Sequence, residues 1–331
     1  METTVINLVR WLRPPLVWVA LGVALLASAR AEGFPARPVT IVVPYAAGGF
    51  TDQLARVIAP ALAARWGQPV VVDNRNGGGT TIGTALVARA PGDGHTLLLT
   101  GFGFTANPLL MKNLPYDPKA LAPVTLVADA PSVLFVANKV PASNLAEFVA
   151  YMRRNPGKVV FASSGNGSSP HVGAEMLASM VGVPIVHAAY RGNAPALNDL
   201  MGGQVDAMLD SPSSMNFVQA GRMKVIGVAS EQPLARAPEL VPLTSAGVPE
   251  LAHYVCGGWF GFFLPAKTPA PLQRRIYEDL RSVLALPEVR EGIQNVGGEP
   301  RQKTPAEFAA YLEAETQRWA PVIRERNIHL D

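Results

Sequence analysis

A glycine-rich segment, Pro44-Tyr45-Ala46-Ala47-Gly48-Gly49-Phe50-Thr51-Asp52, follows the first β-branched run of the chain, Val39 to Val43. Its glycines let the backbone approach a bound molecule closely, and the first N–H groups of a helix that starts here have no partner inside the helix. Such a helix start attracts anions. The segment therefore predicts an anion-binding loop, with a tight strand-to-helix turn as the alternative. The candidate binding residues in it are Tyr45, Ala47, Gly48, Gly49, Phe50, Thr51 and Asp52.

A second segment of the same kind, Ser163-Ser164-Gly165-Asn166-Gly167-Ser168-Ser169, follows the run Val159 to Ala162. It is rich in hydroxyl and backbone N–H groups and has no charged side chain. A hydrogen bond to a charged group contributes about 1.5–3 kcal/mol, so two such loops could hold a carboxylate without a salt bridge. A polar turn that caps the next helix is the alternative. The binding residues predicted here are Ser163, Ser164, Gly167 and Ser168.

Four further residues stand near the ends of predicted strands and are candidates for the same site. His171, in the first turn after the serine segment, either contacts a ligand or supports that segment. Tyr190 and Arg191 follow the strand that ends at Ala189, and the arginine either binds a distal carboxylate or is solvated. Asp210 either binds a ligand amine or hydroxyl or holds its own loop by local hydrogen bonds.

The stretch from Gly101 to Ala106 matches the dinucleotide pattern G-x-G-x-x-A. Bulky Phe102 and Phe104 would crowd a pyrophosphate, and Pro108 is expected to interrupt the helix that the pattern requires. We interpret the two phenylalanines instead as aromatic residues that line the site. The five histidines lack metal-ligand spacing, and the chain has no P-loop, nucleophile elbow or H-E-x-x-H motif. We expect no cofactor and no metal.

Short β-rich runs alternate with helical patterns, which predicts an α/β fold of mainly parallel sheets covered by helices. One series runs from Val39 to Thr100, and a second begins with Ser132 to Ala137. Ser143 is expected to cap a helix that ends near Asn155. After Cys256 the chain offers the apolar run Trp259 to Leu264 and then helices only, the longest from Pro305 to Arg324.

The terminal helical block has too few strands for a sheet of its own, so it should pack on the first unit. The chain is then expected to cross between two lobes twice, and two crossings make a hinge. We predict that residues 32–134 and 257–331 form lobe 1 and that residues 135–256 form lobe 2.

The first residues have the pattern of a secretory signal. Arg10 and Arg13 precede an apolar run from Leu16 to Ala27, and small residues follow. We predict a signal peptide at residues 1–31, with an uncleaved membrane anchor as the alternative. Its removal takes away three arginines and one glutamate and lowers the formal charge from +3 to +1. Such a surface argues against nucleic acid as a partner. The single cysteine, Cys256, can form no internal disulfide, and we expect a buried thiol.

Several separate segments, in this order, resemble the Bug proteins, the solute-receptor subunits of tripartite tricarboxylate transporters. The likeness covers nearly all of the chain after the signal, and several motifs in order are more specific than any one of them. The matching segments are Arg37 to Pro44 with Gly48, Gly49 and Asp52, Val71 to Gly78, Asp93 to Leu97, Asn107-Pro108, Leu114 to Asp117, Ser163 to Gly165 with His171, Tyr190 to Gly192, Gly202 to Asp206, Trp259, Gly261, Pro265, Thr268-Pro269, Thr304-Pro305 and Trp319.

This resemblance implies a periplasmic receptor of the type II periplasmic-binding-protein kind, with two Rossmann-like lobes joined by a two-strand hinge. A small organic carboxylate would be closed between the lobes by residues 45–52 and 163–169, partly through bound water. The receptor would deliver it to membrane subunits of a transporter. We expect a monomer that binds no nucleic acid. Phe50 stands where the family often has a small residue. With Phe102 and Phe104 it favours a ring-bearing ligand.

Two other functions are compatible with the sequence. One is an exported enzyme, a hydrolase or isomerase, that uses the same cleft. The other is a ligand-sensing receptor for a signalling partner. Ser168 and His171, three residues apart on one helix face, are the only plausible catalytic pair, and no third partner is evident.

Overall fold

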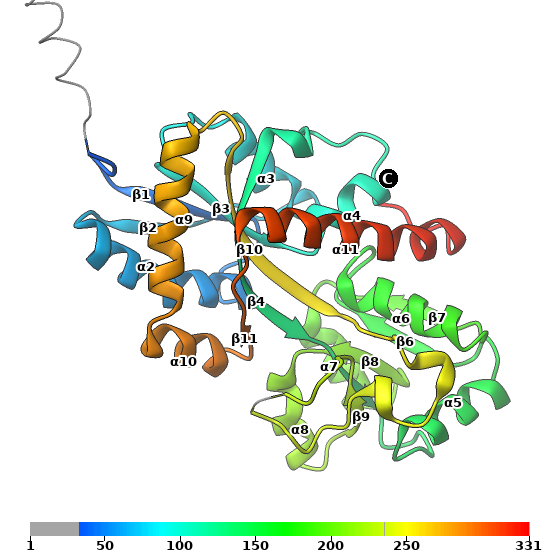
Figure 1. Cartoon of the computed structure of the whole chain (residues 1–331). Helices are drawn as coiled ribbons and strands as arrows, with labels where there is room; N and C mark the ends of the chain where they lie inside the picture. Colours follow the sequence, from blue (N-terminus) through cyan, green and yellow to red (C-terminus); the bar gives the residue numbers. More distant parts are fainter. Residues whose placement is uncertain (1–32, 235, 331) are drawn as a thin grey trace, which may run out of the picture.

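The computed structural model describes residues 33–234 and 236–330, which form two β-sheets with helices packed against them (Figure 1). The first sheet has six strands in the order β11-β4-β10-β3-β1-β2, and the second has five in the order β7-β6-β8-β5-β9. The predicted signal peptide lies outside the described residues. Within the described part, no helix is long and apolar enough to cross a membrane.

The parallel half of the first sheet follows the β-branched and leucine-rich runs of the sequence. Its strands are β1 (Val39–Val43), β2 (Val70–Asn74) and β3 (Thr96–Gly101), and β1 pairs parallel with both neighbours. Each leads into a helix, in turn α2 (Phe50–Trp66), α3 (Thr81–Arg89) and α4 (Gly103–Leu110). Because the strands are parallel, their carboxyl ends share one border of the sheet. We call this border the lobe 1 edge.

Antiparallel strands complete the first sheet. β4 (Leu121–Pro131) pairs along its length with β10 (Gly257–Pro265), and β11 (Glu299–Pro300) adds a short pair to β4. The helices α9 (Ala270–Leu284), α10 (Pro287–Asn295) and α11 (Pro305–Glu325) follow β10. Buried residues of α2 and α9 pack on one face of the sheet, and those of α3 and α11 pack on the other.

The second sheet is also mixed. Its strands are β5 (Val133–Val136), β6 (Val160–Ser163), β7 (Val186–Ala189), β8 (Ala207–Asp210) and β9 (Lys224–Val228), and its helices are α5 (Leu145–Arg154), α6 (Ser169–Met180), α7 (Asn193–Met201) and α8 (Met215–Gln219). β6 pairs parallel with β7 and with β8, so the carboxyl ends of these three strands also lie together. We call this border the lobe 2 edge. Single 3-10 turns occupy Gly78–Thr80, Pro118–Ala120, Pro212–Ser214, Leu243–Ser245 and Pro249–Leu251.

The chain crosses between the sheets at Ser132, which separates β4 from β5, and returns at Cys256, which precedes β10. The two crossings are bonded to each other, since the Ser132 N–H donates to the Cys256 carbonyl at 2.9 Å. Strands of the first sheet thus lie at residues 39–131 and 257–300, and strands of the second at 133–228. The lobe boundary predicted after residue 134 falls inside β5.

The last helix, α11, contributes to the cores of both lobes. Phe308, near its start, packs against Trp259 in the first lobe. Trp319 and Ile323, three turns further on, belong to the buried cluster of the second lobe. Figure 1 shows α11 (red) running from the first sheet to a position above α6. The assignment of this whole helix to lobe 1 from its sequence therefore missed its packing against the second lobe.

Three local predictions need correction. Pro108 does not interrupt a helix but lies inside α4, which is short and forfeits only one backbone hydrogen bond to the proline. Asn144, not Ser143, caps α5, because its side-chain oxygen accepts the Glu147 N–H at 2.9 Å. β4, with eleven residues, was not predicted, since Pro123 and Asp129 break its apolar pattern.

Candidate functional site

The lobe 2 edge brings together the polar residues that were predicted in the second half of the chain. β7, β6 and β8 are neighbours, so the segments that follow them are neighbours as well. Backbone hydrogen bonds join these segments directly: the Tyr190 N–H donates to the Ser163 carbonyl at 3.0 Å, and the Gly192 N–H to the Ser164 carbonyl at 3.2 Å. The serine loop, residues 163–168, and residues 190–192 therefore form one surface.

The serine loop is folded on itself by its own hydroxyl groups. Ser163 Oγ accepts the Gly165 N–H at 3.1 Å, and Ser168 Oγ donates to the Gly165 carbonyl at 2.7 Å. Gly165 and Gly167 have φ angles of 139° and 70°, which favour glycine. Two of the predicted binding hydroxyls, on Ser163 and Ser168, are therefore already engaged, and the loop offers backbone N–H groups instead.

Five helices that start at the two edges have no side-chain cap. Their N-cap residues are Gly49 for α2, Thr80 for α3, Phe102 for α4, Ser168 for α6 and Gly192 for α7. By contrast, Asn144 caps α5 and Thr304 caps α11 through a capping box. α9 and α10 also start without a side-chain cap, but away from the two edges. Unbonded N–H groups at a helix start are anion-binding groups, so the edges have the chemistry for a carboxylate.

At the lobe 1 edge, Asp52 holds the glycine loop, residues 45–52, in place. Its carboxylate, almost fully buried, accepts the Gly48 N–H at 2.8 Å and the Arg56 Nε–H at 3.0 Å. Burial acts to raise the pKa of Asp52, but hydrogen bonds from Arg56, Gly48 and Asn74 outweigh it and lower the pKa. Asp52 is thus ionised, and its carboxylate is hydrogen-bonded within the loop. Thr51 beside it is also buried. Asn74 Nδ2 donates to the Tyr45 carbonyl at 3.2 Å, while Ala47 is exposed.

The three predicted aromatic residues are used in packing. The Phe50 ring lies 4.7 Å from that of Phe260. Phe104 lies 4.4 Å from Phe263, and Phe102 meets Trp319 edge to face at 5.4 Å. Phe102 and Phe104 are buried. Each ring has an aromatic partner within the protein, so the expectation that three rings line the site and favour a ring-bearing ligand is not supported.

Segments of the two lobes approach each other at two places. At the first, a Cβ on Gly167 would lie 2.9 Å from Leu110 of α4 and 3.0 Å from Leu330 near the C-terminus. At the second, a Cβ on Gly298 would lie 3.1 Å from the Phe50 ring, and one on Gly297 would lie 3.4 Å from Ser211 Oγ. Gly167 with Leu110, and Gly297 with Ser211, are thus close approaches between segments of the two lobes.

The remaining candidates support the lobe 2 edge. His171 Nδ1 accepts the Gly167 N–H at 3.0 Å, so of the two roles left open for His171 the structure shows support of the loop. Tyr190 donates its hydroxyl to Asp199 at 2.6 Å. Asp210 accepts hydrogen bonds from Asn193 and Ser214, and burial raises its pKa. Arg191 is exposed.

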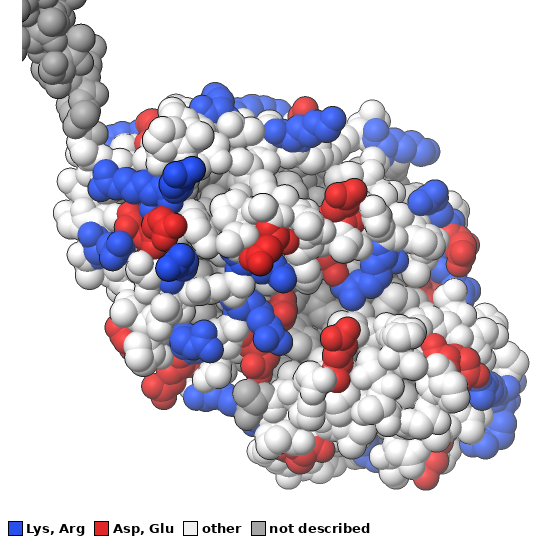
Figure 2. All heavy atoms as spheres, viewed as in Figure 1, with Lys and Arg blue, Asp and Glu red and all other residues white. Residues whose placement is uncertain are grey.

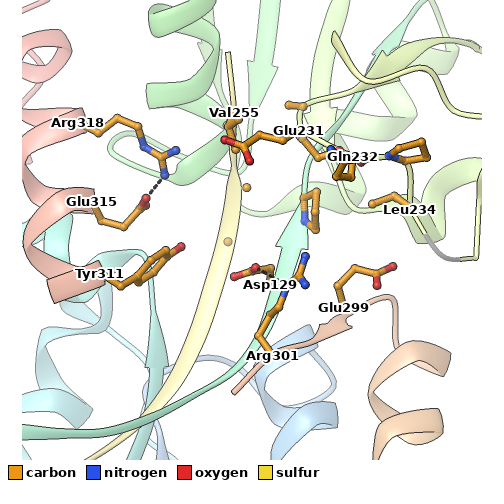
Figure 3. Close-up of a pocket in the computed structure, with 17 residues that line it drawn as sticks. Asp129, Glu231, Gln232, Leu234, Val255, Glu299, Arg301, Tyr311, Glu315 and Arg318 are labelled. Atoms are coloured by element: carbon orange, nitrogen blue, oxygen red, sulfur yellow. Dashed lines mark hydrogen bonds and ion pairs between the residues drawn. The ribbon is translucent and has the colours of Figure 1, made fainter. Parts of the chain in front are cut away.

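A cavity of about 310 Å³ lies elsewhere, between α11, β4, the return crossing and the loop at residues 229–234 (Figure 3). None of the predicted site residues lines it. Its charged side chains are Asp129, Glu231, Glu299, Glu315, Arg301 and Arg318. Carboxyl groups thus outnumber guanidinium groups in its lining, four to two. A second cavity of about 210 Å³, between α8 and the end of α10, is also lined by other residues. Within residues 33–234 and 236–330, no cluster of three or more potential ligands is placed to hold a metal.

Comparison with known proteins decides the family. Residues 54–328 match the model of the tripartite tricarboxylate transporter family receptor. The chain belongs to this family. It is 36% identical to the UPF0065 protein in the tcbD-tcbE intergenic region of Pseudomonas sp. (strain P51), over 91% of this chain and 89% of that protein. It is 32% identical to protein BugT of Bordetella pertussis, over 98% and 99% of the two chains.

Solved structures give the same result for the fold. The protein Rpa4515 of R. palustris, determined with adipate, superposes with a TM-score of 0.79 at 32% identity, covering 90% of this chain and 99% of that one. MatC of Rhodopseudomonas palustris, with bound malate, superposes with a TM-score of 0.75 at 30% identity, covering 88% and 100%. The predicted family and the predicted periplasmic-binding-protein fold are thereby confirmed.

The sequence analysis missed three side chains of this receptor site. Asn74 and Asn193 hold the Tyr45 carbonyl and Asp210, and both stand at the end of a strand or the start of a helix, where the strand-end argument would have found them. His187 Nε2 lies 2.6 Å from Ser163 Oγ. It lies within a predicted strand, and only the pairing of β7 with β6 places it beside the serine loop.

Proposed function

We propose that this receptor binds a small aliphatic carboxylate between the lobe 1 and lobe 2 edges. The observation that carries the proposal is the set of uncapped helix starts at the edges, among them those of α2 beside the glycine loop and of α6 and α7 beside the serine loop. Each offers backbone N–H groups and the positive end of a helix dipole. The similar structures with adipate and malate support an aliphatic acid, and the engagement of Phe50, Phe102 and Phe104 within the protein removes the reason to expect an aromatic one.

Charge favours the edges over the cavity. Asp52 and Asp210, the carboxylates at the edges, are bonded to partners within the protein. The exposed Arg191 adds a positive charge near the lobe 2 edge. The cavity near α11 has more carboxylates than guanidinium groups, so a carboxylate there would be repelled.

The predicted periplasmic location, the export by residues 1–31, the delivery of ligand to membrane subunits and the monomeric state form part of this proposal. They are supported by family membership. In this mechanism the ligand favours the closed arrangement of the lobes, and the partner recognises that closed shape. The glycine and serine loops would meet one carboxylate from opposite sides.

A binding function is also favoured over catalysis by the state of the predicted catalytic pair. Ser168 donates its hydroxyl to the Gly165 carbonyl, and His171 Nδ1 is occupied by the Gly167 N–H. A serine nucleophile needs a base that accepts its hydroxyl proton, and these two side chains are not joined in that way.

The proposal is tested by a ligand screen on the mature chain. Native mass spectrometry would identify what co-purifies, and calorimetry would then measure adipate, malate, benzoate and an uncharged diol. We expect one bound molecule per chain, with an aliphatic acid preferred. Binding of the diol alone, or no carboxylate retained in either measurement, would overturn the proposal.

A further inference from the structure

Two histidines lie stacked beneath the serine loop. His171, in the first turn of α6, and His187, in β7, have ring centroids 3.6 Å apart and an interplanar angle of 8°. Each is bonded to the loop. His171 Nδ1 accepts the Gly167 N–H at 3.0 Å, and His187 Nε2 lies 2.6 Å from Ser163 Oγ. The two ends of the loop are therefore fastened to two imidazoles that touch each other.

The contact with Gly167 requires a neutral His171 ring, whereas Ser163 Oγ donates its proton to the Gly165 carbonyl and therefore accepts from His187 Nε2. Because the backbone N–H of Gly167 can only donate, His171 Nδ1 must be unprotonated, and its single proton is on Nε2. A second proton would go to Nδ1, where it would point at the Gly167 N–H and break the hydrogen bond between them. It would also place a positive charge against the face of His187. Burial, and secondly His187, lower the pKa of His171 to about 4, and burial lowers the pKa of His187 as well.

The other titratable groups near α6 do not supply a counter-charge. The thiol of Cys256 lies 3.8 Å from the Ser169 carbonyl, and burial raises its pKa to about 11. The Tyr254 hydroxyl donates to the Gly173 carbonyl, and burial raises its pKa too. Both groups are neutral at physiological pH. Glu175, one turn beyond His171, pairs at 3.5 Å with Arg326, the residue that follows α11. Among the described residues, only His187 acts electrostatically on the pKa of His171.

We propose that His171 and His187 are positioning residues of the carboxylate site: as a stacked pair they hold the serine loop, and protonation of His171 releases it. This inference rests on the proposed function in assigning ligand binding to that loop. At low pH the loop is no longer held in place, and ligand affinity falls.

The direction of this pH effect follows from the lowered histidine pKa values. A histidine whose folded pKa lies below the ordinary 6.5 leaves the folded state with fewer bound protons than the unfolded state. The native arrangement therefore loses stability as the pH falls from about 6.5 toward 4.

The first test needs no ligand. In the full mature chain, NMR would follow the two imidazoles and the Gly167 amide between pH 7.5 and 4. We expect His171 to be protonated on Nε2 alone at pH 7.5, and the Gly167 amide shift to titrate together with that ring. An imidazole that titrates near 6.5 with an unchanged Gly167 amide would overturn the proposal.

The second test is a pH profile of adipate affinity for the wild type, His171→Asn and His253→Asn. Ligand protonation affects all three proteins equally, so differences report on the protein. Asn supplies an acceptor for Gly167 without titrating, whereas His253 is exposed and serves as the matched control. We expect the wild type and His253→Asn to lose about tenfold more affinity than His171→Asn between pH 7 and 4.5. Parallel profiles would contradict the inference. If adipate does not bind, the proposed function is in question while the NMR titration still decides the role of the histidines.

Discussion

The two opposed edges and the cavity beside α11 are both built from segments of both lobes, yet they differ in chemistry. The edges present glycines, hydroxyls and backbone N–H groups, and their acidic side chains are bonded within the protein. The cavity presents charged side chains paired with one another, Arg301 with Asp129 and Arg318 with Glu315 (Figure 3). The cavity is thus the less suitable place for a carboxylate, and the sign of the local charge decides between the two regions.

The distribution of charged side chains over the visible face does not distinguish the two edges from the cavity. Figure 2 shows basic and acidic side chains mixed across the visible face rather than gathered by sign. Attraction of an anionic ligand must therefore come from groups within a few ångströms, because exposed charges further apart are screened. This makes the helix starts at the edges, and not the overall charge, the feature to test.

The largest expected effect concerns α11, which packs into the cores of both lobes and lines the cavity. Trp319→Ala removes a fully buried ring from the cluster of the second lobe and should lower the free energy of unfolding by about 3–5 kcal/mol. Urea titration would measure it. Leu286→Ala, at a side chain 36% exposed, is the control and should cost less than about 1.5 kcal/mol. Equal losses would show that α11 does not bind the lobes together through this residue.

The next prediction compares a glycine of the lobe 1 edge with a matched glycine elsewhere in the fold. Gly48 has a φ of 81°, so Gly48→Val should strain the glycine loop by about 1–3 kcal/mol and weaken carboxylate binding roughly tenfold or more. Gly221→Val is matched to it, with a φ of 68° and open space around it, but it follows α8. It should lower stability and leave the affinity in calorimetry unchanged. A similar loss of affinity in both variants would remove the special role of the loop.

A smaller effect is expected from Asp52. Asp52→Ala leaves the Gly48 N–H without its acceptor and should weaken binding by about 1–2 kcal/mol, whereas Asp52→Asn keeps an acceptor and should lose less. The pKa of Asp52 is lowered in the folded state, so its stabilising contribution is complete above its ordinary pKa near 3.9 and disappears at lower pH. Thermal unfolding of the wild type and Asp52→Asn should therefore converge in acid. A constant difference down to pH 2 would argue against this role.

The smallest effect tests the cavity. Glu231→Gln removes one carboxylate from its wall and should change carboxylate affinity less than twofold, because the ligand binds elsewhere. Calorimetry with the best ligand of the screen would measure it. A tenfold gain of affinity on loss of this negative charge would place the carboxylate in the cavity and would reverse the comparison.

The segments of the candidate site could be predicted because they lie where parallel strands end. The glycine loop, the serine loop and Tyr190 to Gly192 were found from their positions after β1, β6 and β7. The roles of individual side chains were less predictable. Ser163 and Ser168 have the hydroxyls of a binding loop, but their hydrogen bonds turn inward. The Phe50, Phe102 and Phe104 rings could have faced a ligand, but each met an aromatic partner from another part of the chain.

The sequence by itself determined most of the strands and helices, though not β4, together with the backbone turns that need glycine and, through its motifs, the family. These depend on neighbouring residues, whose periodicity and φ preferences act locally. Only the tertiary structure decided that α11 enters both cores, that Gly167 lies against Leu110 of the other lobe, and that His171 and His187 stack beneath the serine loop. Such contacts join residues through the pairing of strands and the packing of helices, and packing selects one partner for each buried side chain from many that the sequence allows.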